Sequence, residues 1–255
     1  MKLFSKIYKI FIFAFLYLPV FILVFFSFNN SKSRIVWSGF TFAWYIKLFS
    51  NKYILSAFLN TVEIATISSI VSTIFGTVSA FGIFSCKSKT KKLILNITNL
   101  PMLNPEIVTG ISLMILFVYF RNTLGFLKFG MLTVTIAHIT FCLPYVILSI
   151  LQKLNQLDPN FYEAALDLGC TPSKAIFYTI LPEILPNISS GILLCFTMSI
   201  DDFLISYFTN GNVQTLPILI YSMTQKLVSP EINALSSVMF LIIITLIFVN
   251  KKKKS

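Results

Sequence analysis

Two adjacent carboxylates, Asp201 and Asp202, lie within a long apolar segment of this chain. An ionised carboxylate at the centre of a membrane helix costs roughly 2.5–3.5 kcal/mol to insert, so the pair requires a water-filled cavity, a cationic partner or protonation. No Lys or Arg lies deep within an apolar segment to neutralise the pair. The pair therefore indicates a site for a cationic ligand, with hydrogen bonding to backbone or to neighbouring helices as the alternative.

The geometry of a helix limits how these carboxylates can act together. Consecutive helical positions differ by about 100°, so the two side chains can border one cavity from two sides without sharing a face. The only histidine, His138, lies in another apolar segment. We expect a hydrogen-bonded core histidine there. A proton relay would need an acidic neighbour, and the sequence leaves open whether either aspartate supplies one.

A polar stretch between apolar segments carries a second set of signals. Asp158 can accept an N–H bond from the first turn of a helix, Pro159 fits the first helical position, and Gly169 can adopt the left-handed conformation that ends a helix. We therefore predict a short helix from about Pro159 to Leu168. Its apolar stripe, at i, i+3, i+4 and i+7, consists of Phe161, Ala164, Ala165 and Leu168. Thr171-Pro172 then opens a second helix.

The composition shows whether these elements fold in water or in a membrane. The chain is 56% hydrophobic and 11% charged, with a mean hydropathy of +0.84, which excludes a soluble globular domain. Crossing the hydrocarbon takes about 20 residues, so the third of six predicted spans is short and could be re-entrant. The first span follows three lysines but has no small-residue cleavage site, and we interpret it as a retained helix. The spans are residues 7–28, 62–84, 107–120, 131–151, 188–208 and 232–249.

The distribution of basic residues predicts the orientation. With the N-terminus inside, most of the 20 Lys and Arg residues, including the run at 251–254, lie in the cytoplasm. The positive-inside bias therefore places both termini and the Glu163 stretch on the cytoplasmic side. The net charge of +11 is explained by these flanks and by anionic membrane lipid. Basic residues are not gathered on one face with aromatics, so no nucleic-acid partner is expected.

The polar stretch resembles the EAA loop of binding-protein-dependent, MetI-like ABC importer permeases. The resemblance rests on Glu163-Ala-Ala, on Gly169 and on Leu181-Pro182. It implies an all-α integral membrane protein of about six transmembrane helices, with one permease domain over residues 1–255 and a cytoplasmic loop at 152–187. In that family a coupling helix in the loop docks into a groove of a separate ATPase. The residues implied for docking are Tyr162, Glu163, Ala164, Ala165, Leu168 and Gly169.

A narrower resemblance extends along nearly the whole chain. Five stretches are similar to the C-type permease subunits of bacterial spermidine/putrescine transporters, at residues 39–45, 138–145, 196–203, 216–223 and 229–235. That family imports polyamines, which are flexible polycations. The resemblance implies a substrate path with Asp201, Asp202, Tyr207 and Tyr221, and Trp37 is a further aromatic candidate. For any single aromatic residue here, anchoring at the lipid interface is the alternative.

The sequence lacks the motifs of an enzyme. No Gly-x-x-x-x-Gly-Lys-Ser/Thr loop, Gly-x-Ser-x-Gly or His-Glu-x-x-His occurs, and the four cysteines are scattered without metal-ligand spacing. We expect no metal or cofactor on this chain and no enzymatic activity. ATP and magnesium would belong to a partner ATPase.

The family resemblance implies the remaining partners. They are two copies of the ABC ATPase, a second homologous permease subunit and an external polyamine-binding protein, assembled in the inner or plasma membrane of a bacterium. ATP would drive polyamine import by alternating access. The alternatives are an ion-coupled secondary transporter or channel for organic cations, with Asp201, Asp202 and His138 as a proton path, and a membrane scaffold. The sequence does not distinguish spermidine from putrescine as the cargo.

Overall fold

The computed structural model describes residues 2–31, 36–125, 127–158, 160–225 and 231–252. Within these ranges the regular secondary structure is helical, with turns and loops between the helices and one isolated β-bridge between Asn29 and Phe40. The helices are α1 (Lys2–Phe26), α2 (Ala43–Ser50), α3 (Lys52–Phe84), α4 (Ser88–Leu103), α5 (Glu106–Leu124), α6 (Met131–Leu154), α7 (Asn160–Asp167), α8 (Pro172–Ala175), the π-helix η1 (Ile176–Ile180), α9 (Leu181–Asp201), α10 (Leu204–Thr209), α11 (Leu216–Gln225) and α12 (Glu231–Lys252).

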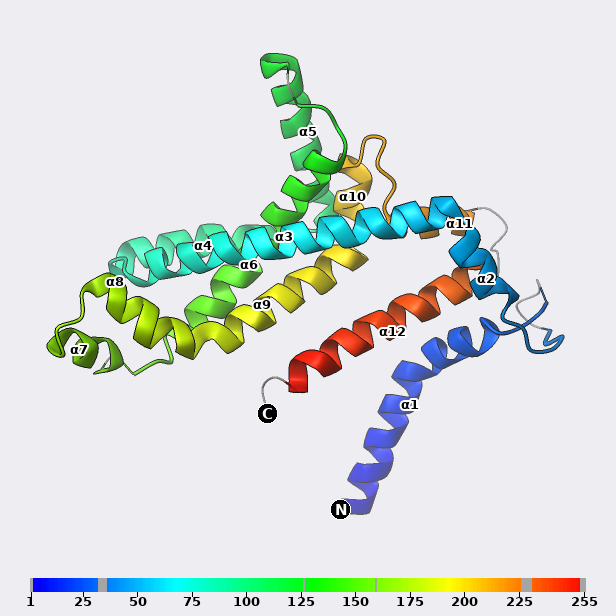
Figure 1. Ribbon diagram of the computed structural model, residues 1–255, viewed down its shortest axis with the longest axis horizontal. Helices are drawn as coiled ribbons and strands as arrows, with labels where there is room; N and C mark the ends of the chain where they lie inside the picture. Colours follow the sequence, from blue (N-terminus) through cyan, green and yellow to red (C-terminus); the bar gives the residue numbers. More distant parts are fainter. Residues whose placement is uncertain (1, 32–35, 126, 159, 226–230, 253–255) are drawn as a thin grey trace. The chain divides into compact units, whose positions relative to one another are not determined.

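The chain divides into two compact units. One contains Met1–Ser56 and Leu219–Leu246, and the other contains Ala57–Ile218 and Ile247–Ser255. The expectation of a single permease domain with a loop at 152–187 stays a prediction. Figure 1 shows the elements of each unit along the chain.

Five helical stretches within the described residues are long and apolar enough to cross a membrane. A sixth helix, α12, carries a shorter apolar stretch at Glu231–Thr245. These six agree in order with the predicted spans. The third is longer than predicted, because α5 begins at Glu106 and reaches 19 residues. The five longer stretches are Lys6–Phe26, Lys52–Phe84, Glu106–Leu124, Met131–Leu154 and Pro172–Asp201.

The predicted fifth span, an unbroken helix over residues 188–208, is wrong at both ends. The helix begins earlier, at Pro172, and passes through η1 just before Pro182. Proline has no N–H and its ring clashes with the preceding turn, and a π-turn accommodates both effects. At the other end the helix stops at Asp201, the backbone of Asp202 is extended, and α10 follows.

In the first unit, polar bonds and aromatic rings fix the segment between α1 and α2. The indole Nε1 of Trp44 donates to the carbonyl of Asn29 over 2.7 Å. The rings of Phe28 and Phe40 stack with their centroids 5.1 Å apart. Lys47 of α2 forms an ion pair with Glu231 at the start of α12. The two ends of this unit, distant in sequence, are therefore joined.

In the second unit, α6 forms the centre of the core and packs along α9 (Figure 1). Val146 and Ile150 of α6 and Ile184 of α9 are fully buried. Between the two helices, Cys142 donates its S–H to the carbonyl of Cys195 over 3.7 Å, and Cys195 donates to the carbonyl of Cys142 over 3.8 Å. These two bonds set the register between α6 and α9.

Candidate cation-binding junction and docking loop

The break between α9 and α10 is built around the side chain of Asp202. Its backbone is extended, with φ −70° and ψ 119°. Its carboxylate accepts the backbone N–H of Ser206 over 2.9 Å and that of Ile205 over 3.4 Å. The first amides of a helix have no partner within the helix, so a carboxylate placed there satisfies them. Asp202 therefore ends one helix and caps the next.

His138 of α6 contacts every part of this break. Its Nδ1 lies 2.6 Å from Ser199 Oγ on α9, and its Nε2 lies 2.9 Å from Ser206 Oγ on α10. The same Nε2 lies 3.3 Å from Asp202 Oδ2, and the two side chains are 1% and 2% exposed. Ser68 of α3 extends the cluster by donating to Ser199 Oγ over 3.1 Å. The expected hydrogen-bonded core histidine is found here, and its acidic neighbour is Asp202.

A separate cavity opens beside the break. Its volume is ≈ 350 Å³ and it is lined by Glu106, Phe141, Thr197, Met198, Asp201 and Asp202. Asp201 and Glu106 are exposed, whereas Asp202 is buried. Among the residues that the structure describes, neither exposed carboxylate has a basic ion-pair partner. The two adjacent aspartates thus have different surroundings: Asp202 is buried and hydrogen-bonded at the break, whereas Asp201 is exposed at the cavity.

The position of Glu106 depends on close packing between α5 and α10. A Cβ added to Gly110 would lie 3.0 Å from Phe208 Cδ2 and 3.3 Å from the Leu204 carbonyl oxygen. Glu106 lies one turn before Gly110 on the same helix. Sequence reasoning did not select Glu106 as a site residue. The available signal was an acid directly after Pro105, at the start of an apolar helix.

The aromatic residues predicted for the substrate path are each described within their own unit. Tyr207 of α10 is half-exposed and contacts the rings of Phe203 and Phe208, at centroid distances of 5.4 and 5.5 Å. It is not among the residues that line the acidic cavity. Tyr221 belongs to α11 in the first unit. Trp37, also in that unit, stacks on Phe25 at 4.5 Å. The roles of these aromatics stay predictions.

The short helix predicted at about residues 159–168 is found as α7, with the predicted residues at its two ends. The carboxylate of Asp158 accepts the N–H of Asn160 over 3.0 Å at the start of α7, whereas Pro159 lies outside the described residues. Gly169 has φ +85° and donates to the Leu166 carbonyl over 2.9 Å. The N–H of Cys170 then reaches the Ala165 carbonyl over 3.1 Å, as in a helix-ending turn. The predicted cap and the left-handed glycine are confirmed.

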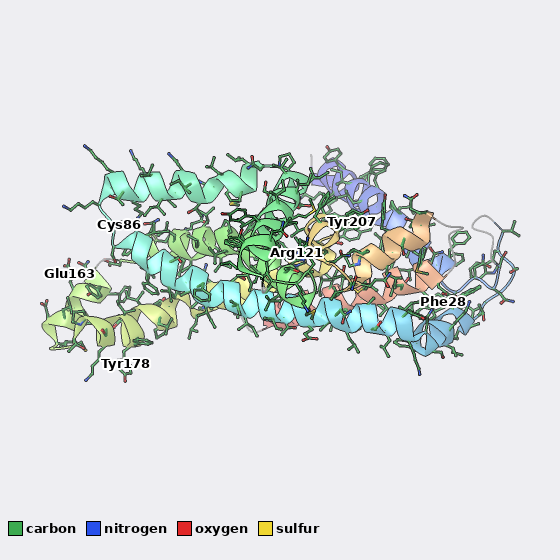
Figure 2. The ribbon with its side chains drawn as sticks, turned by 90° about the horizontal axis from the view of Figure 1, so that it is seen from above. Phe28, Cys86, Arg121, Glu163, Tyr178 and Tyr207 are labelled. Atoms are coloured by element: carbon green, nitrogen blue, oxygen red, sulfur yellow. The ribbon has the colours of Figure 1, made fainter. Side chains whose placement is uncertain are left out.

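The surface of α7 is largely open. Ala165 packs inward, whereas Ala164, Phe161 and Leu168 are exposed, and 86% of the Leu168 surface is accessible. Apolar side chains left uncovered in this way mark an interaction surface. Figure 2 shows Glu163 at the same end of its unit as Cys86, which lies just after α3.

Tyr162 and Glu163 border a groove behind α7. Its volume is ≈ 270 Å³, and the remaining lining residues come from the ends of α3 and α6, the segment that follows α6, and η1. They are Phe81, Phe84, Ser85, Leu154, Leu157, Asp158, Ile176 and Ile180. The residues predicted for docking therefore divide between this groove and the exposed face that carries Ala164 and Leu168.

This combination of apolar helices and an exposed loop helix corresponds to a known family. The sequence model of the family described as binding-protein-dependent transport system inner membrane component matches residues 72–250. The chain belongs to this family. As such a component it is a multi-pass inner membrane protein with the all-helical MetI-like permease fold.

Sequence alignments with two relatives cover most of this permease. It is 36% identical over 241 residues to the spermidine/putrescine transport system permease protein PotC of Haemophilus influenzae, an alignment that covers 94% of this chain and 92% of the relative. It is 40% identical over 232 residues to the putrescine transport system permease protein PotI of Escherichia coli K12, covering 88% and 81%.

A solved structure shares the fold of this permease. It is the crystal structure of a bacterial alginate ABC transporter in complex with an alginate pentasaccharide-bound periplasmic protein. One of its chains superimposes with a TM-score of 0.73 at 16% identity, over 97% of this permease and 92% of that chain. At this identity the similarity establishes the architecture alone.

Proposed function

We propose that this permease is a subunit of an ATP-driven importer that moves polyamines such as spermidine or putrescine into the cytoplasm. The observation that carries the proposal is the cavity with two exposed carboxylates, Asp201 and Glu106, and no basic ion-pair partner among the described residues. The relatives named for spermidine and putrescine transport support the same cargo.

The chemistry of the cavity suits a polyamine. Charged groups in an apolar protein are stabilised chiefly by an opposite charge with hydrogen bonds, and an alkyl ammonium supplies both to a carboxylate. Two carboxylates at one cavity complement two amines of one flexible chain. The ring of Phe141 on the wall can add a cation–π contact of about 0.5–2 kcal/mol. The methylene segments of the cargo would lie against Phe141 and Met198.

The energy for transport would come from other chains. In the proposed assembly, α7 and the residues around Glu163 and Gly169 dock on an ABC ATPase, present in two copies with ATP and magnesium. A second homologous permease completes the path, and an external binding protein delivers the polyamine. The open surface of α7 supports this arrangement. Both termini and α7 would face the cytoplasm, and ATP-driven closure of the ATPase dimer would turn the cavity outward.

The test is uptake of labelled spermidine and putrescine into vesicles that contain the reconstituted complex, with and without ATP. We expect ATP-dependent uptake that falls by a factor of about ten or more in Asp201→Asn and in Glu106→Gln, because each loses a charge-assisted bond to an amine. Glu183→Gln, an exposed acid at the start of α9, is the matched control and should transport normally.

The same vesicles distinguish the alternative functions. Uptake driven by a proton gradient without ATP, from a chain that purifies without an ATPase subunit, would indicate an ion-coupled transporter. The His138–Asp202 contact is the feature that such a proton path would use. Recruitment of a soluble protein without any uptake would indicate a scaffold. Either outcome would refute the proposed function.

A further inference from the structure

The buried cluster at the helix break has no place in the transport scheme above, although it lies directly beside the cargo cavity. Its members come from four helices and the junction itself: Ser68 of α3, His138 of α6, Ser199 of α9, Ser206 of α10 and Asp202 between the last two. All five are buried. The cost of burying so many polar groups is offset only if they bond to one another.

The direction of the hydrogen bonds follows from the carboxylate. An ionised carboxylate only accepts, so His138 Nε2 carries the proton that faces Asp202 Oδ2 and Ser206 Oγ. In the neutral ring Nδ1 then accepts from the hydroxyl of Ser199, whose oxygen accepts from Ser68. One chain of donors is therefore aligned toward Asp202, and the imidazole is its central link.

We propose that His138 is a positioning residue for the cargo site: it holds Asp202 in the helix break, so that of the two adjacent aspartates only Asp201 binds the cargo. The inference rests on the proposed function, because it treats Asp201 as the carboxylate that meets the amine. It assigns the adjacent aspartates separate roles. Asp201 binds cargo, and Asp202 is a structural anion held by His138 and by the α10 amides.

The geometry explains why the histidine has to be in place. Its ring contacts the last turn of α9 through Ser199 and the first turns of α10 through Ser206, so it joins the two sides of the break. Phe141, one turn further along α6, lines the cavity beside Asp201. Without the ring, Asp202 loses its side-chain donor and becomes free to leave the cap. The end of α9 then rotates, and Asp201 turns with it.

The same element also positions the second cargo-facing carboxylate. The backbone of α10 packs closely against Gly110, one turn from Glu106, so that an added Cβ would lie 3.3 Å from the Leu204 carbonyl oxygen. A displacement of α10 therefore moves both walls of the acidic cavity. His138 acts on Asp201 through the break and on Glu106 through α10, without lining the cavity itself.

The experiment measures the position of residue 201 without relying on transport. The reconstituted complex carries Asp201→Cys, together with Cys86→Ser and Cys170→Ser to remove the two partly exposed native thiols. The probe is a cationic, water-soluble methanethiosulfonate, and the measured quantity is its rate of reaction with the new thiol. This rate is compared among three proteins: the parent with His138, the variant His138→Gln, which keeps a donor for Asp202, and the variant His138→Leu, which has no donor.

We expect His138→Leu to change the modification rate by a factor of about ten, since a buried charged group loses its donor, and His138→Gln to stay within about threefold of His138. In the chain that retains Asp201, His138→Leu should raise the apparent KM for uptake by a similar factor, with rescue by Gln. Val146→Ala, a cavity-forming change on the same buried helix, is the matched control. It should lower the yield of complex without changing the modification rate or KM.

The inference is overturned if His138→Leu leaves both the modification rate and KM within about threefold of the parent, the range allowed for a variant that keeps its donor. If His138→Leu does not assemble, the double variant Ser199→Ala and Ser206→Ala, which retains the ring and Asp202, decides in the same way. Protection of the introduced thiol by spermidine is recorded separately. A changed rate without protection would support the positioning role and contradict the proposed cargo.

Discussion

The docking loop and the helix break differ in which residues they bury. The loop leaves apolar side chains exposed, whereas the break buries polar ones. On α7 only Ala165 is buried, and Leu168 is 86% exposed. At the break, His138, Ser199, Asp202 and Ser206 are all buried and bonded to one another. The loop helix buries one residue of its own, whereas the break is held by side chains of two other helices, α3 and α6.

This difference distinguishes a surface that is buried only when another protein binds from a site whose polar groups are all bonded within the chain. An apolar face left open, as on α7, gains stability only when a partner covers it. A satisfied polar cluster fixes one arrangement and tolerates little change, because any member that loses its bond stays buried without one. We therefore expect substitutions at the break to affect folding first, and substitutions on α7 to affect assembly first.

The largest expected effect is that of Asp202→Leu. Removing the carboxylate leaves the Ile205 and Ser206 amides without their acceptor and leaves the His138 Nε2–H with Ser206 Oγ alone. Loss of one member of a buried pair costs about 3–5 kcal/mol. The measurement is the unfolding midpoint of the purified complex in detergent. Asp201→Leu at the neighbouring, exposed position should change it little. Equal midpoints for the two variants would show that the aspartates share one environment.

Gly110→Leu should have the next largest effect. Its side chain would enter the contact with Phe208 and the Leu204 carbonyl, and overpacking of this kind costs about 1–3 kcal/mol. Uptake should fall as well, because Glu106 moves with α5. The control is Gly82→Leu on α3, where an added Cβ meets nothing within 4 Å. If both leucine variants unfold at the same temperature, α10 does not position α5.

Gly169→Val changes the end of the docking loop. A φ of +85° costs a β-branched residue about 1–2 kcal/mol, so α7 must end differently. We expect loss of polyamine-stimulated ATP hydrolysis by the complex. Asn adopts the left-handed conformation readily. The complex that carries Gly169→Asn should therefore keep nearly normal polyamine-stimulated ATP hydrolysis. The loop geometry would be irrelevant to coupling if the valine and asparagine variants were alike.

Glu163→Ala should have the smallest effect on stability. Glu163 is exposed on α7, so the unfolding midpoint should stay the same. Affinity for the ATPase subunit should fall by a factor of about ten, the value of one charge-assisted bond. Titration of the permease with the purified ATPase measures it. Glu183→Ala removes the same charge outside α7 and should bind normally, and identical affinities would exclude a docking role for Glu163.

The sequence predicted the loop helix well because its signals are local. Asp158 and Gly169 lie at the two ends of the helix that they cap, so their partners are within a few residues. The six apolar segments were equally visible, since length and hydropathy suffice to find them. The third segment was predicted short because its apolar run covers only residues 107–120, whereas α5 extends from Glu106 to Leu124.

The helix break was not predictable in the same way. Asp201 and Asp202 are neighbours in sequence, which suggested one shared role within an unbroken helix. What separates them is His138, which lies 61 residues before Ser199 and 68 residues before Ser206. Glu106 joins Asp201 only because α5 packs on α10. Contacts of this range depend on tertiary packing, and no local pattern in a single sequence specifies them.

The most direct test is a structure of the assembled transporter with a polyamine bound. We predict an amine nitrogen within hydrogen-bonding distance of the Asp201 carboxylate, with Glu106 facing the same cavity and Asp202 still held by His138. An amine bound to Asp202, or an Asp201 side chain that faces lipid, would contradict the separate roles of the two aspartates.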